Sequence, residues 1–300
     1  SYLEQKRESL PYEIDGAVFK LNKLELWKIL GETSRSPRWA VAFKFSPRTA
    51  KTVIKDIQVN VGRTGTITPV AILEPVKIGG VTVSRATLHN EDEIRRLDLH
   101  EGDTVLLIKS GEIIPKILQV IPEKRKPNAK PVSFPTQCPA CGSPLQKDEE
   151  GAIHYCSNVA CPAQLQRRIE HFASRDAMDI TGLGESLIAR LLENKLISGI
   201  ADLYRLDYDK LAQLEHFGPK SAQNLKNAIE ASKTRNFDRV LYALGIRYVG
   251  TVTARYLAEY SGDIDSLRNA SLESLSQVPE VGEKVALAIK AWFSLPENIK

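Results

Sequence analysis

The stretch TVIKDIQVNVGRTGTITPVAILEPVKIGG, residues 52–80, decides the fold of the region around it. Its β-branched residues come in short runs separated by glycine and proline, as in chains where strands alternate with tight turns. Similar runs follow in VTVSRATL (81–88) and DTVLLIKSGEIIPKILQVI (103–121), and a single helix-like segment, EDEIRRLDLHEG (91–102), interrupts them. Many short strands with one helix favour a small barrel of the OB-fold type. We therefore predict an OB-fold over residues 49–130.

Two glycine-flanked turns of this barrel carry polar side chains. Arg63 and Thr64 lie on the first turn, and Lys109 and Ser110 lie on the second. Basic and hydroxyl groups on barrel loops suit a DNA backbone, so we predict that these turns contact DNA. The alternative for each residue taken alone is an ordinary solvated turn.

Four cysteines fall within one short segment, and the rest of the chain has none. A secreted protein distributes disulfides across its fold, whereas cysteines kept together in a reducing compartment are typical of a metal site. Two close pairs suit tetrahedral zinc, and four thiolates leave no open coordination position, so the metal would be structural. Disulfides or free thiols are the alternative. We predict a zinc module over residues 131–165, with Cys138, Cys141, Cys156 and Cys161 as its ligands.

From residue 166 onward the chain has helical hydrophobic spacing, and one pattern occurs four times. Each copy has a hydrophobic residue, a glycine, three variable residues and an apolar residue, which describes a tight hairpin entering a helix. The glycines are Gly184, Gly218, Gly250 and Gly282, which are 34, 32 and 32 residues apart.

These hairpins are suited to phosphate binding. Glycine exposes backbone N–H groups at a helix N-terminus, and such a turn binds phosphate without reading sequence. Four turns in register could follow a duplex backbone, and Lys220, close after its glycine, adds positive charge, although Glu185 opposes it in the first hairpin. A helical interaction domain whose turns are merely capped is the alternative. We predict an all-helical DNA-binding domain over residues 166–300.

The first 48 residues contain two strand-like runs, at 17–22 and 39–45. Their apolar residues are typical of buried strands, yet each run contains a lysine, Lys20 in the first and Lys44 in the second. Together the two ammonium groups could form the basic wall of a cleft for an anion such as phosphate. The alternative is that each lysine reaches solvent from a strand edge.

Composition limits the class of protein. The chain has 300 residues, 42% of them hydrophobic, and a net charge of +4, which permits nucleic-acid binding without requiring it. No apolar stretch is long enough to cross a bilayer and no signal peptide is evident, so we expect a cytoplasmic protein with no membrane partner. The proline- and lysine-rich stretch 121–135 is expected to be a solvated linker.

Longer motifs follow one another along the chain. They are LPYEIDGAVFKLN (10–22), SPRWAVAFKF (36–45), VGRTGTITPVAILEPV (61–76), ATLHNEDEI (86–94), GDTVLLIKSGEIIP (102–115), CPACG (138–142), AMDITGLGESLI (177–188), GPKSAQNL (218–225) and LYALGIRYVG (241–250). In this order, from about residue 5 to 290, they closely resemble the bacterial NAD-dependent DNA ligases.

The resemblance implies a multidomain α+β fold: a partial nucleotidyltransferase (adenylation) domain over residues 1–48, the OB-fold barrel, the four-cysteine zinc module and an all-α helix-hairpin-helix domain. It also implies roles for individual residues. Lys20 and Lys44 match lysines that contact the adenylyl group taken from NAD, and Asp15 matches a carboxylate important for nucleotidyl transfer. Arg7 matches an arginine near the DNA or adenylate phosphate.

The implied activity is sealing of 5′-phosphate/3′-hydroxyl nicks in duplex DNA with NAD as the adenylyl donor and Mg²⁺ or Mn²⁺ assistance, in replication and repair near the nucleoid. The nucleophilic lysine of the family stands in a K-x-D-G motif, but the one Asp-Gly step here is preceded by Glu13 at the lysine position. We therefore expect that the nucleophile and the NAD-binding N-terminal domain belong to an upstream half that is missing from this chain, and that the chain does not adenylate itself.

Two other hypotheses remain open at this point. A non-catalytic module of barrel, zinc site and hairpins could bind duplex DNA without chemistry, but it would not need residues 1–48. A protein-interaction scaffold could use the helical repeats for other contacts, and it would show no salt-dependent DNA binding.

Overall fold

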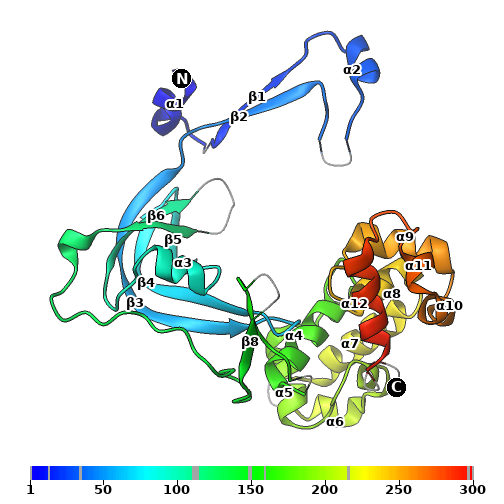
Figure 1. The fold of residues 1–300 in the computed structure, drawn as a ribbon. Helices are drawn as coiled ribbons and strands as arrows, with labels where there is room; N and C mark the ends of the chain where they lie inside the picture. The colour runs from blue at the N-terminus through cyan, green and yellow to red at the C-terminus, as the bar shows by residue number, and fades with distance from the viewer. Residues whose placement is uncertain are drawn as a thin grey trace. The chain divides into compact units, whose positions relative to one another are not determined.

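The structure is a computed structural model that carries side chains and describes residues 2–12, 14–33, 36–109, 115–147, 151–158, 160–214, 217–295 and 298. It contains a two-stranded ribbon, a closed five-stranded barrel, a second small sheet and a helical region (Figure 1). The expected multidomain α+β fold is confirmed. The residues divide into two compact units, and the second comprises 61–67, 136–147 and everything from Tyr155 onward.

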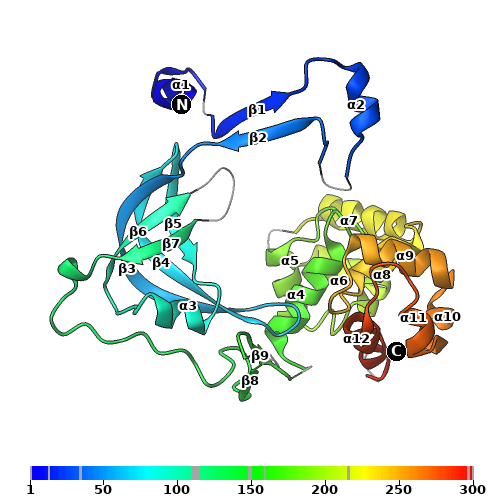
Figure 2. The ribbon, with the colours of Figure 1, turned by 45° about the horizontal axis from the view of Figure 1, so that its top comes forward.

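The N-terminal segment is built on an antiparallel ribbon, whose two strands run side by side in Figure 2. Lys20 pairs with Ala40 and Gly16 pairs with Lys44, so both lysines lie on one face of the ribbon. The glycine is required, because a Cβ at Gly16 would lie 2.4 Å from the carbonyl oxygen of Phe43. The elements are α1 (Tyr2–Lys6), a 3₁₀ turn (Arg7–Ser9), β1 (Gly16–Lys20), α2 (Glu25–Leu30) and β2 (Ala40–Lys44).

The ribbon corrects the expectation of buried strands. Val18 and Phe19 of β1 are 60% and 65% exposed, and Phe43 of β2 is 49% exposed. The strands form where the apolar runs predict them, but a two-stranded ribbon cannot cover its own faces. Local composition therefore indicated strand formation correctly, and in this chain the apolar side chains of the strands are exposed.

The predicted barrel is confirmed. Its strands are ordered β3-β4-β5-β7-β6, and β6 closes the barrel by pairing with β3. Ile54, Leu73 and Leu107 fill the interior with almost no exposed surface, and Asn90 accepts a hydrogen bond from the backbone of Glu93 to cap the single helix. The elements are β3 (Arg48–Val61), β4 (Ile67–Ile78), β5 (Val81–Thr87), α3 (Glu91–Arg96), β6 (Thr104–Lys109) and β7 (Lys116–Val120).

The stretch after the barrel is more ordered than a solvated linker. It begins with a 3₁₀ turn (Pro122–Lys124), and Arg125 then donates hydrogen bonds to the buried carboxylate of Asp103 at 2.9 and 3.1 Å and to Asp98 at 2.7 Å. Val132 donates a backbone hydrogen bond to Leu99. The segment is mostly exposed, as expected of a solvated linker. Paired charges and backbone hydrogen bonds nevertheless hold it against the barrel, which its composition did not indicate.

The remaining elements belong to the zinc-module and helical regions. Hydrophobic residues form one core around the first two glycine hairpins, including Leu183, Ile188 and Ala222, and another around the last two, including Ala254 and Ala286. The elements are β8 (Leu145–Lys147), β9 (His154–Cys156), α4 (Pro162–Ala173), α5 (Glu185–Glu193), a 3₁₀ turn (Ala201–Arg205), α6 (Tyr208–Ala212), α7 (Pro219–Ser232), α8 (Phe237–Ala243), α9 (Thr251–Ser261), α10 (Ile264–Asn269), α11 (Leu272–Leu275) and α12 (Glu283–Phe293).

Candidate functional site

Each of the four repeated glycines is the N-cap of a helix, as the sequence pattern predicts. They precede α5, α7, α9 and α12, with φ between −80° and −93° and extended ψ. The apolar residue four positions later is buried in every copy, which anchors the helix start in the core. The four glycines are Gly184, Gly218, Gly250 and Gly282.

The glycine-led helices lack the side-chain caps that three other helices of this region have, and α4 and α8 lack such caps as well. Asp207, Asp263 and Ser271 accept hydrogen bonds from the first turns of α6, α10 and α11, whereas none of the four glycine-led helices has a side-chain cap. All four glycines are exposed, and a Cβ at any of them would meet nothing within 4 Å. The fold therefore presents open helix N-termini to which an anion can come close.

Charge near these N-termini is uneven. Lys220 is exposed at the second helical position of α7, and Lys284 is exposed at the same position of α12. Glu185, which opposes an anion in the first hairpin, lies 3.3 Å from the guanidinium of Arg167. The arginine offsets part of that negative charge.

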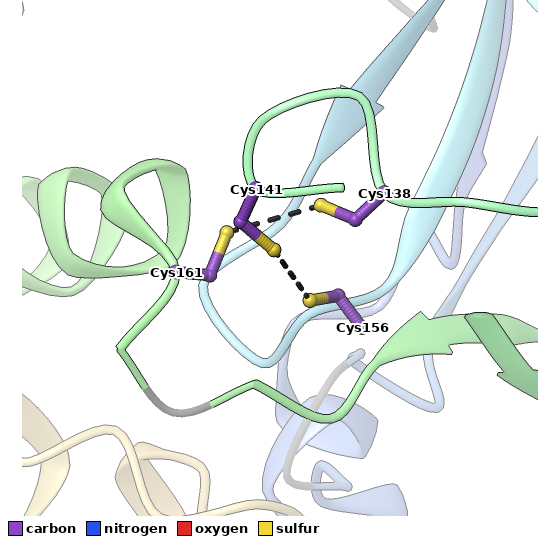
Figure 3. Close-up of side chains that lie close together, drawn as sticks. All are labelled: Cys138, Cys141, Cys156 and Cys161. Atoms are coloured by element: carbon purple, nitrogen blue, oxygen red, sulfur yellow. Dashed lines mark hydrogen bonds between the residues drawn. The ribbon is translucent and has the colours of Figure 1, made fainter. Parts of the chain in front are cut away.

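The four cysteines converge on one point (Figure 3). The sulfur atoms of Cys138 and Cys161 are 3.9 Å apart, those of Cys141 and Cys156 are 3.5 Å apart, and all four lie within 4.8 Å of one another. Tetrahedral ligation with Zn–S of about 2.3 Å places sulfurs about 3.8 Å apart, so the cluster fits zinc.

Local structure explains this convergence. The first pair lies on a tight turn in which Gly142, with φ of 71°, donates its N–H to the carbonyl of Cys138. Cys156 ends β9, and Cys161 is the N-cap of α4, which Pro162 begins. A turn, a strand end and a helix start thus supply the four ligand positions.

The thiols have unequal proton affinities. Hydrogen bonding with Ser143 lowers the pKa of Cys141 to about 6, whereas burial raises the pKa of Cys156 to about 12 and also raises the pKa of Cys161. A divalent cation supplies the charge that stabilises thiolates at such buried positions. The donor set is therefore that of a closed structural zinc site.

The N-terminal segment brings together two of its candidate residues that the sequence did not pair. The Nζ of Lys44 donates to a carboxylate oxygen of Asp15 at 2.7 Å, and this hydrogen bond holds the pKa of Asp15 below its usual range. Lys20, on the same ribbon face as Lys44, has its Nζ 5.9 Å from the ring centre of Trp39. The candidate anion-binding face thus carries two cations, Lys20 and Lys44, and the second forms a hydrogen bond to Asp15.

Arg7 lies near this pair. Its Nη1 donates to the carbonyl of Ser46 at 3.3 Å. The pKa of Asp15 is lowered mainly by the hydrogen bond from Lys44 and least by the charge of Arg7. Its Nε is buried without a hydrogen-bond partner among the described residues. Arg7 is therefore held by the fold and retains a donor.

The residues predicted to contact DNA on the two barrel turns differ in their surroundings. Arg63 donates to the carbonyl oxygen of Gly245 at 2.6 Å, a contact that nothing in the sequence indicates because the two residues are 182 positions apart. Thr64 is exposed, with its hydroxyl 3.2 Å from that of Thr66. The Lys109 side chain and all of Ser110 lie outside the described residues, as does Glu13.

No helix in the described part of the chain is both long enough and apolar enough to cross a membrane.

Family comparisons match almost the whole chain in consecutive pieces. The models matched are the NAD-dependent DNA ligase adenylation domain (1–48), the NAD-dependent DNA ligase OB-fold domain (51–129), the NAD-dependent DNA ligase C4 zinc finger domain (137–163), a SAM-like helix-hairpin-helix tandem (174–231) and a helix-hairpin-helix motif (239–300).

Individual relatives agree with these matches. A DNA ligase of a Hydrogenobaculum species is 53% identical over 99% of this chain, and those of Chloroherpeton thalassium and Aquifex aeolicus are each 51% identical over 98% and 99%. The chain spans 43%, 43% and 41% of the length of these three relatives. The chain belongs to the NAD-dependent DNA ligase family, whose adenylation, OB-fold, zinc-finger and helix-hairpin-helix regions it matches in that order.

Proposed function

We propose that this chain holds nicked duplex DNA and completes the adenylyl-binding site of an NAD-dependent DNA ligase that joins 5′-phosphate and 3′-hydroxyl ends. One observation carries the DNA-binding part: four exposed glycines begin four helices, and none of these helices has a side-chain cap. Open N–H groups at a helix start bind phosphate oxygens without reading base sequence. A ligase that must act at any nick needs that kind of contact.

The adenylyl chemistry would use the ribbon face. Phosphoryl transfer depends mainly on alignment and on stabilising charge on the phosphate oxygens. Lys44 and Lys20 would supply positive charge beside the phosphate of AMP, and Asp15 would orient Lys44 through their 2.7 Å hydrogen bond. Arg7 would add positive charge near that phosphate, as its effect on the pKa of Asp15 indicates.

The nucleophile would come from another segment. The 300 residues contain one Asp-Gly step, Asp15–Gly16, and Glu13 stands where the family places its lysine. We expect this chain to accept an adenylylated partner half and not to form the lysine adenylate alone. The AMP would pass to the 5′-phosphate, and the 3′-hydroxyl would then displace it.

Metal ions would have separate tasks. Zinc, held by the four cysteines, would stabilise their module and take no part in strand joining, because a site with four thiolates has no open position. Mg²⁺ or Mn²⁺ would assist the phosphoryl transfers. The cysteines form the only group of three or more metal-ligating side chains in the described part of the chain. Substrate phosphates would provide ligands of the second metal.

The test is strand joining in trans. The chain is mixed with the upstream portion of a relative's ligase, nicked duplex and either NAD or ATP, and joined strands are measured on a denaturing gel. We expect joining with NAD only, loss of joining with Lys44→Ala, and no change with Lys28→Ala on α2 as the matched control. Duplex binding without joining would instead support the non-catalytic module.

A further inference from the structure

The tips of the first, third and fourth glycine hairpins have a left-handed backbone. Two residues before the glycine cap stand Gly182, Tyr248 and Glu280 in the first, third and fourth hairpins, with φ of 91°, 67° and 64°. The corresponding residue of the second hairpin lies outside the described residues. Glycine adopts this conformation freely, but tyrosine does so at a cost. Backbone strain of this kind is often found where a side chain has a task.

The ring of Tyr248 is exposed and lies close to two cations. It is 44% exposed, the Arg247 guanidinium carbon is 4.9 Å from the ring centre, and the Nζ of Lys284 is 5.2 Å from it. Arg247 also lies 6.0 Å from the ring centre of Tyr155. Cation–π attraction of this kind fixes the direction of an exposed ring.

The ring is also linked to two open helix starts. Tyr248 is two residues before Gly250, which begins α9, and it contacts Lys284, which is two residues after Gly282 at the start of α12. The two hairpins share one hydrophobic core. The proposed function places a phosphate at each of these helix starts. The part of a nucleic acid that lies between phosphates and can pack against an apolar ring is the sugar.

We propose that Tyr248 packs its ring against deoxyribose edges in the minor groove of duplex DNA, with Arg247 and Lys284 holding the ring and facing the flanking phosphates. The inference rests on the proposed function and adds a shape-dependent contact to it. Side chains that enter the minor groove respond to groove width and to sugar position, whereas phosphate contacts alone do not. The tip of the first hairpin, Gly182, has no side chain to make such a contact.

The backbone at the tip permits a test that separates contact from folding. Tyr248→Gly removes the ring while giving φ of 67° the residue that suits it best, so the relieved backbone offsets part of the stability lost with the ring. Asparagine also adopts a left-handed backbone, so Tyr248→Asn removes the ring while leaving the chain less flexible than Tyr248→Gly does. Glu280→Gly makes the same kind of backbone change in the fourth hairpin without removing a ring.

Affinity is measured by fluorescence anisotropy with labelled nicked duplex and with a single strand of the same sequence. We expect Tyr248→Gly and Tyr248→Asn to weaken duplex binding about tenfold, the scale of one lost aromatic contact to a nucleic acid. Tyr248→Phe should bind as the wild type does, and Glu280→Gly should bind at least as tightly, because it loses a negative charge near the fourth hairpin. Tyr248→Gly should remain folded, with a cooperative thermal transition. The salt dependence of its DNA affinity should match that of the wild type, because no cation has been removed.

Two results would overturn the proposal. Unchanged duplex affinity in both Tyr248→Gly and Tyr248→Asn would show that the ring makes no contact, and an equal loss for single-stranded and duplex DNA would show base stacking in place of a groove contact. A wild-type chain that binds no duplex at all would instead contradict the proposed function itself.

Discussion

Arg63 at the tip of the β3–β4 hairpin donates a hydrogen bond from Nη1 to the carbonyl oxygen of Gly245, 2.6 Å away. Gly245 lies just beyond α8, where helix carbonyls lack partners and a cation is favourable. Burial lowers the pKa of Arg63, and a Cβ at Gly245 would lie 2.8 Å from Nη1. Arg63 therefore holds the loop that leads into the third glycine hairpin.

Replacing Arg63 should lower the free energy of unfolding and have little effect on the salt dependence of DNA binding. Arg63→Ala removes a hydrogen bond from a charged donor, which costs about 1.5–3 kcal/mol. We expect that loss in urea unfolding, while Thr64→Ala on the same turn remains within about 0.5 kcal/mol of wild type. If Arg63 instead binds a DNA phosphate, the variant would keep its stability and the salt dependence of DNA binding would fall by about one phosphate contact.

His171 makes the same region sensitive to acid. Its Nε2 lies 2.8 Å from the carbonyl oxygen of Tyr242, and burial, followed by the charge of Arg63, lowers its pKa below the usual 6.5. The neutral ring is thus favoured in the folded state, so its full stabilisation is present above about pH 6.5 and is lost as the pH falls through the lowered folded pKa.

We expect the free energy of unfolding to decrease between about pH 7 and pH 5, a window above the titration of ordinary carboxylates. The decrease should be smaller in His171→Gln, which cannot be protonated. Parallel pH profiles for the two proteins would contradict this role of His171.

The cysteine cluster predicts one zinc per chain. Cys156→Ser removes a ligand that also donates its backbone N–H to Gly65, and we expect bound zinc to fall from about one equivalent to nearly none by elemental analysis. His154→Asn is the matched control because His154 lies close by on β9 but outside the cluster. Equal zinc in the two variants would show that the cysteines do not hold the metal.

The glycine caps can be tested without disturbing the core. Gly250→Ala adds a Cβ that meets nothing in the fold but occupies the space an approaching phosphate needs. We expect a stability cost of at most about 1 kcal/mol and a loss of about tenfold in duplex affinity. Gly199→Ala, equally open but not at a hairpin helix start, should bind DNA normally. Equal duplex affinities of Gly250→Ala and the wild type would show that Gly250 does not contact DNA.

Much of the fold follows from local patterns. The four glycine caps were predictable because a buried apolar residue four positions later repeats with each of them, and the cysteines were predictable because metal ligation restricts their spacing. The parallel pairing of β5 with β7 and the closure of β3 on β6 were not predictable residue by residue, since such pairings depend on the whole barrel.

Long-range contacts account for most of what the sequence did not indicate. Arg125 reaches a buried Asp103 that sits at the start of a strand, and Arg63 reaches a backbone carbonyl, which has no side-chain signature at all. The exposure of the β1–β2 ribbon was also not predictable. Residues such as Val18 and Phe19 favour a strand, but their type does not indicate which part of a protein covers it.

The central claim, that the glycine-led helices hold the phosphates of duplex DNA, is tested most directly by a salt titration of duplex binding. The account predicts that log K falls linearly with log salt, and that Lys220→Ala and Lys284→Ala each reduce the slope by about 0.9, the value for one phosphate neutralised. Binding that is independent of salt, or two lysine variants with the wild-type slope, would contradict it.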